Sequence, residues 1–119
     1  MNTRLFLYGS LKRGFPNNRL LEGQRFLGEA TTRPRYRLYD VGEYPALLPV
    51  TDGGIAIRGE VWEVDTTALV ALDRYECLHK GLYTRQAIQL EGPFEATGVE
   101  AYLYLRSVEG LLDCGAEWK

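Results

Sequence analysis

The chain has 119 residues, of which 45% are hydrophobic and 25% are charged, a composition typical of one globular domain large enough to bury a core. We therefore predict a single domain spanning residues 1–119. The formal net charge is −2 and the 14 Lys and Arg residues are scattered along the chain, which argues against a nucleic-acid partner.

Cysteine usage and the N-terminus bear on the cellular compartment. The two cysteines, Cys77 and Cys114, lack the spacing of a zinc site or a disulfide framework. The N-terminal residues lack the apolar stretch of a signal peptide, and no apolar run approaches the length of a membrane span. These features predict a soluble protein of the reducing cytoplasm, with no membrane partner.

An apolar run near the N-terminus, residues 5–8, stops at Gly9 and Ser10. The run predicts a buried central strand, and Gly9 and Gly14 permit backbone conformations that other residues resist. A loop of this kind can hold a carboxylate or an oxyanion through its backbone N–H groups. The alternative is an ordinary turn between a strand and a helix.

The next segments are short. Pro16-Asn17-Asn18 offers a helix start and Gly23 a stop, which predicts a short helix over residues 18–22. Strand-like patterns follow over residues 24–39, and residues 44–50 are apolar but contain two prolines. Because proline cannot donate a backbone hydrogen bond, we place residues 44–50 at a sheet edge or in an extended segment.

The second half of the chain continues with strand and helix patterns. Residues 55–64 alternate cleanly and predict a strand, and Asp65 caps a helix over residues 68–76. Residues 82–90 and 97–106 predict a hairpin. The expected anchors of the C-terminal tail are Leu111, Leu112 and Trp118. Since strands dominate, we predict an α+β fold, with a small, partly closed antiparallel or mixed sheet against short helices.

Glu76 is the first candidate for chemistry. Leu69, Leu72 and Glu76 are spaced to share one stripe of the predicted helix, so a carboxylate occupies a core-facing position. Burial and the helix dipole would both raise its pKa, as proton transfer near neutral pH requires. The alternatives are an ion pair with Arg85 or Arg58, or a helix that ends early and leaves Glu76 in solvent.

Cys77 and His79 suggest a nucleophile and a base, but residues two apart do not face each other on a helix, and no third orienting group is evident. His79 is the only histidine, and the carboxylates lack metal-site spacing, so we predict no metal. Tyr102 and Tyr104 share one strand face, as do Tyr83 and Arg85. These side chains line a pocket or simply pack with their hydroxyls at the surface.

Five short motifs occur in order along the chain. They are Tyr8-Gly9-Ser10-Leu11, Tyr44-Pro45-Ala46, Leu72-Asp73-Arg74-Tyr75-Glu76, Tyr83-Thr84-Arg85 and Ala101-Tyr102-Leu103-Tyr104. In combination they resemble the gamma-glutamylcyclotransferase-like superfamily, particularly its compact bacterial members and the gamma-glutamylamine cyclotransferases. The chain departs at Ser10, where threonine is common and the hydroxyl is retained, and at Cys77, where glycine is frequent.

The resemblance implies a small β-barrel flanked by helices and an enzyme that needs neither metal nor cofactor. It would convert a γ-glutamyl amine or γ-glutamyl amino acid to 5-oxoproline, with Glu76 as the catalytic acid and base. The Tyr8 to Leu11 loop would hold the α-amino-acid end of the substrate. The substrate-binding residues expected from these motifs are Tyr8, Gly9, Ser10, Leu11, Tyr44, Tyr83, Arg85 and Tyr104.

Two other functions stay open at this point. The same fold could bind γ-glutamyl compounds without consuming them. A general amidase or thiol hydrolase using Cys77 would instead form a covalent intermediate and incorporate water. The sequence does not identify the amine that the reaction would release. We expect a monomer or a weak homo-oligomer.

Overall fold

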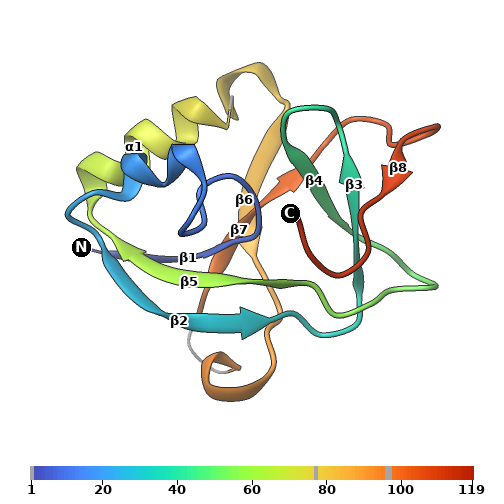
Figure 1. The fold of residues 1–119 in the computed structure, drawn as a ribbon, viewed down its shortest axis with the longest axis horizontal. Coiled ribbons are helices and arrows are strands. Elements are labelled where there is room, and N and C mark those ends of the chain that lie inside the picture. Colours follow the sequence, from blue (N-terminus) through green and yellow to red (C-terminus); the bar gives the residue numbers. More distant parts are fainter. Residues whose placement is uncertain (1, 77, 96–97) are drawn as a thin grey trace.

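The computed structural model describes residues 2–76, 78–95 and 98–119 (Figure 1). Its larger sheet has the strand order β2-β5-β1-β7-β6. The bounds of these strands are β1 Thr3–Leu7, β2 Arg25–Thr31, β5 Arg58–Val64, β6 Tyr83–Ala87 and β7 Glu100–Tyr104. The smaller sheet has the order β4-β3-β8, with β3 Tyr36–Asp40, β4 Pro45–Pro49 and β8 Leu112–Asp113.

One α-helix and three short 3₁₀ helices complete the described chain. They are α1 Thr66–Tyr75, η1 Pro16–Leu21, η2 Leu78–Lys80 and η3 Gly92–Phe94. The α+β prediction is confirmed. The strands are divided between two hydrogen-bonded sheets, and a closed barrel is not formed by the strands that the structure describes. Within the same residues, no helix has the length and apolar character needed to cross a membrane.

Strand β1 lies in the middle of the larger sheet, as its apolar run predicted. It is antiparallel to β5 and parallel to β7. Its side chains alternate between two cores. Phe6 packs in a cluster with residues of the smaller sheet such as Leu38 and Leu47, whereas Leu5 and Leu7 join Leu72 of α1. A strand buried on both faces reads as a continuous apolar run.

Several elements match their predictions. Strand β4 is an edge strand, and β6 and β7 form the predicted antiparallel hairpin, although residue 97 lies outside the described residues. Asp65 caps α1, since its side chain accepts a hydrogen bond from the backbone N–H of Ala68. Trp118 packs against the core cluster, as expected of an anchor.

Other expectations need correction. The short helix near residue 20 is 3₁₀ and begins at Pro16, because Pro is accommodated in the first helical turn. Residues 24–39 divide into β2 and β3, which belong to different sheets, and the strand predicted from residue 55 begins at Arg58. Leu112 is not an anchor, since its side chain is 76% exposed on the short strand β8.

Candidate functional site

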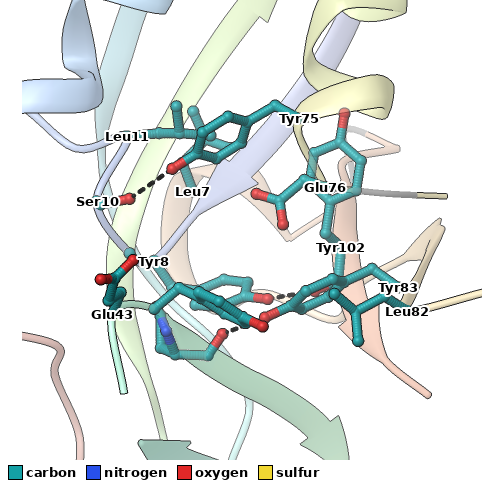
Figure 2. Close-up of a pocket in the computed structure, with 13 residues that line it drawn as sticks. Leu7, Tyr8, Ser10, Leu11, Glu43, Tyr75, Glu76, Leu82, Tyr83 and Tyr102 are labelled. Atoms are coloured by element: carbon teal, nitrogen blue, oxygen red, sulfur yellow. Dashed lines mark hydrogen bonds between the residues drawn. The ribbon is translucent and has the colours of Figure 1, made fainter. Parts of the chain in front are cut away.

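A cavity of about 280 Å³ opens where β1 ends, between the end of α1 and the starts of β4 and β6 (Figure 2). Apolar, phenolic and acidic side chains form its wall. The lining residues are Leu7, Tyr8, Gly9, Ser10, Leu11, Glu43, Tyr44, Pro45, Tyr75, Glu76, Leu82, Tyr83 and Tyr102. Thus most of the predicted site residues, which are far apart in the sequence, meet at one cavity.

The loop after β1 is a tight turn, in which the carbonyl of Gly9 accepts a hydrogen bond from the backbone N–H of Lys12 over 3.1 Å. Within the described chain, no acceptor is found for the backbone N–H groups of Ser10 and Leu11. Two such neighbouring donors at a cavity wall are suited to an anion.

Glycine is required at position 9 for a steric reason. A Cβ atom there would lie 2.7 Å from Cγ and 2.9 Å from Cδ of Pro45, the first residue of β4. The conformational argument made from the sequence holds for Gly14 instead, whose φ is +89°. The close contact between Gly9 and Pro45 therefore joins the loop to the smaller sheet.

Side chains of η1 also hold this loop. Asn18 donates to the carbonyl of Leu11 over 2.7 Å, and Asn17 donates to the hydroxyls of Ser10 and Tyr75 over 3.2 and 2.7 Å. The hydroxyls of Ser10 and Tyr75 are themselves 3.2 Å apart (Figure 2). Tyr75 thus connects the end of α1 to the loop across one side of the cavity.

Glu76 is the C-cap residue of α1, and its backbone N–H donates to the carbonyl of Leu72 over 2.9 Å. Its carboxyl faces the cavity beneath Tyr75 (Figure 2). Burial raises the pKa of this carboxyl from 4.5 to about 7. The two candidate arginine partners are engaged elsewhere, since Arg85 pairs with Asp73 and Glu100, and Arg58 pairs with Glu117.

Three buried phenols lie across the cavity from Glu76. Tyr83 donates to the carbonyl of Pro45 over 2.6 Å, Tyr102 donates to Asp73 over 2.7 Å, and Tyr8 donates to the carbonyl of Tyr102. Burial, and secondarily the nearby charge of Glu76, raises the pKa of Tyr8 and of Tyr83 far above the usual range. These two phenols therefore stay protonated near neutral pH and are not bases.

Two predicted site residues lie outside the cavity wall. Arg85 points to Asp73 and Glu100, and the ring of Tyr104 packs against that of Tyr83, with centroids 5.3 Å apart. The wall also contains residues that were absent from the expected catalytic and substrate-binding set, namely Leu7, Glu43, Pro45, Tyr75, Leu82 and Tyr102. The sequence signal for Tyr75 as a wall residue is its position next to Glu76. For Tyr102 the signal is its place in the Ala101-Tyr102-Leu103-Tyr104 motif.

Metal ligands do not gather in the described residues, where no group of three or more His, Cys, Asp and Glu side chains could hold an ion. Cys114 is a partly buried free cysteine whose backbone N–H donates to Leu38 in β3. Cys77, the cysteine considered as a nucleophile, lies outside the described residues.

Comparison with known proteins identifies the family of the chain. The family model for gamma-glutamyl cyclotransferase, AIG2-like, matches residues 5–119. The chain belongs to this family. A gamma-glutamylcyclotransferase family protein of Escherichia coli, YtfP, is 34% identical over 108 residues, which cover 91% of this chain and 88% of the relative.

Mammalian members of the AIG2-like family are also similar. A gamma-glutamylaminecyclotransferase of Bos taurus is 42% identical over 96 residues, covering 74% of this chain and 57% of the relative. The crystal structure of an AIG2-like protein from Mus musculus superposes with a TM-score of 0.72 at 29% identity, covering 89% of this chain and 78% of the mouse protein. The fold and the family assignment therefore agree.

The raised pKa of Glu76 predicts a pH dependence of stability. The pKa of this carboxyl is higher in the folded than in the unfolded protein, so its protonation stabilises the fold. This contribution is fully present below about pH 4.5 and is lost as the pH rises through about 7. We expect Glu76→Gln to match the wild type at pH 5 and to exceed its free energy of unfolding at pH 8 by on the order of 1 to 2 kcal/mol. Urea denaturation of both proteins at both pH values measures this difference, and equal differences at pH 5 and pH 8 would contradict it.

Proposed function

We propose that this protein is a cyclotransferase that converts a γ-glutamyl amine or γ-glutamyl amino acid to 5-oxoproline, with Glu76 as general acid and base. The observation that carries the proposal is a carboxyl with a pKa of about 7 on the wall of a cavity, facing a turn with two backbone donors that have no acceptor among the described residues. Membership of the AIG2-like family supports the same reaction class.

The substrate supplies its own nucleophile in this reaction. Its α-amine attacks the γ-carbonyl carbon, a new C–N bond closes the five-membered ring, and the original bond from the γ-carbon to the amine breaks. Holding the substrate folded contributes heavily, since well-oriented intramolecular reactions reach effective molarities of about 10⁵ to 10⁸ M. No nucleophile from the protein is needed.

Glu76 performs both proton transfers under this proposal. As a carboxylate it takes a proton from the attacking α-amine, and as a carboxylic acid it delivers that proton to the departing nitrogen. A group with a pKa near the working pH is suited to both steps, because each protonation state is well populated. The backbone N–H groups of Ser10 and Leu11 would hold the α-carboxylate of the substrate.

The buried phenols define the rest of the cavity. Tyr8, Tyr83 and Tyr102 donate their hydroxyl protons to protein acceptors, so they present ring faces and oxygen lone pairs to a substrate. Leu82 adds an apolar surface on the same side. We infer that these residues hold the aliphatic part of the γ-glutamyl group in its folded conformation.

A substrate panel tests the proposal. The protein is incubated with γ-glutamyl amino acids, γ-glutamyl amines and γ-glutamyl-ε-lysine, and the products are identified by mass spectrometry. We expect 5-oxoproline and the free amine. Binding without any product would indicate a ligand-binding domain, and glutamate that carries oxygen from ¹⁸O-labelled water would indicate a hydrolase.

Cys77→Ala tests the thiol alternative. Ring closure by the substrate's own amine needs no protein nucleophile, so we expect turnover by this variant within a few-fold of the wild type. Steady-state kinetics on the best substrate of the panel measures the effect. Loss of turnover in a folded variant that still binds substrate would support a thiol enzyme instead.

A further inference from the structure

Arg85 lies outside the cavity, in an arrangement of opposite charges just behind the cavity wall. From β6 its guanidinium donates to both carboxylate oxygens of Asp73, over 3.0 and 3.2 Å, and to Glu100 of β7 over 2.6 Å. Side chains of Arg85 and Asp73 are only 24% and 25% exposed. A partly buried, forked pair of this kind fixes orientation as well as distance.

Asp73 also receives a second donor, the hydroxyl of Tyr102. Arg85 and Tyr102 are directly opposite each other in the β6–β7 ladder, so their side chains lie side by side on one sheet face. Both therefore reach the same carboxylate, which lies in the last turn of α1 only three residues before Glu76. The cluster of Arg85, Asp73 and Tyr102 joins the end of α1 to the hairpin.

The two elements joined in this way carry opposite walls of the cavity. Glu76 comes from the end of α1, and Tyr83 and Tyr102 come from β6 and β7 (Figure 2). The carbonyl of Tyr102 in turn accepts the hydroxyl of Tyr8, so the cluster extends to the residue that begins the loop. A shift of the α1 end would therefore change the distance between Glu76 and everything that faces it.

We propose that Arg85 is a positioning residue, which holds Glu76 and Tyr102 at a set separation across the cavity by clamping Asp73. The inference deepens the proposed function, since it gives Arg85 a part in the reaction without contact with the substrate. A displacement of about 1 Å in a reacting group can lower the rate about 10²-fold, so such a clamp acts on turnover rather than on affinity alone.

The test compares Arg85 with a second arginine–carboxylate pair, in which Arg37 contacts a single oxygen of Asp113 and lies outside the cavity wall. Arg37 contacts Asp113 at 2.6 and 2.8 Å, and both side chains are 30% exposed. We expect Arg85→Met to lower kcat about 10- to 100-fold at little change in KM, and Arg85→Lys, which keeps the charge but loses the fork, to lower it less. We expect Arg37→Met to keep the wild-type kcat, and thermal melting reports the loss of stability in each variant.

A second measurement needs no substrate. The titration of Glu76 is followed by the carbon chemical shift of its carboxyl in the free protein. Glu76 faces Tyr8, Tyr83 and Tyr102, and Glu43 is the other acidic residue of the wall. In Arg85→Met the carboxylate of Asp73 loses its cation, so we expect the midpoint of Glu76 to move upward. In Arg37→Met we expect no movement.

The outcomes separate this inference from the proposed function. If Arg85 and Arg37 variants of equal stability have the same kcat and the same Glu76 midpoint, the positioning role is wrong. If Arg85→Met fails to fold, kcat of Arg85→Lys decides, because this variant keeps the charge beside Asp73 and loses only the fork. If the wild type releases no 5-oxoproline while the midpoint of Glu76 moves in Arg85→Met and not in Arg37→Met, the proposed reaction fails and the coupling of Arg85 to Glu76 through Asp73 stands.

Discussion

Glu76→Gln is expected to lower turnover at least 10²- to 10⁴-fold, the usual contribution of general acid and base catalysis, in a protein that remains folded. Glutamine matches the shape of the carboxyl and can form hydrogen bonds, so the packing at the end of α1 is retained. It cannot cycle a proton between the α-amine and the departing nitrogen. Release of 5-oxoproline and thermal melting are to be measured on the same preparation.

The melting curve distinguishes catalysis from structure. If Glu76 were one member of a structural ion pair, the substitution would leave a partly buried arginine unpaired, and activity would fall in step with the folded fraction. The arginines that could serve are instead paired with Asp73, Glu100 and Glu117. Near-wild-type turnover by folded Glu76→Gln protein would remove Glu76 from the mechanism.

Blocking the α-amine of the substrate is expected to abolish the reaction. An N-acetylated γ-glutamyl amine has no nucleophilic nitrogen, so ring closure cannot begin, whereas the binding groups at the γ-end are unchanged. Release of the free amine from the acetylated and the unmodified substrate is to be compared over the same range of protein concentration. We expect no release from the acetylated compound above the uncatalysed rate.

An N-methylated substrate serves as the matched control. The methyl group adds bulk at the same nitrogen, but the amine remains nucleophilic. If the methylated substrate is turned over and the acetylated one is not, the loss is caused by the missing nucleophile and not by the added bulk. Comparable cleavage of acetylated and free substrates would overturn the cyclotransferase proposal. In that case water is the nucleophile and hydrolysis should be tested.

Local patterns in the sequence were enough to predict several elements. The unbroken apolar run of residues 5–8 predicted the central strand β1, because a strand with both faces buried carries no polar alternation. The spacing of Leu69, Leu72 and Glu76 predicted a carboxyl on the buried side of α1, and its raised pKa follows from that burial. Each of these inferences depends on neighbours within a few residues.

Which side chains meet depends on contacts between elements far apart in the sequence. Periodicity assigned Arg85 to the same face as Tyr83, but its partner is Asp73 of α1, and this contact directs the guanidinium away from the cavity. The requirement for Gly9 comes from Pro45, 36 positions along the chain, and not from its own backbone angles. Most of the strands, the family resemblance and the candidate acid could be predicted from the sequence, since these depend on local spacing and motifs. The walls of the cavity were decided by long-range packing, because periodicity specifies a face and leaves open which residue will cover it.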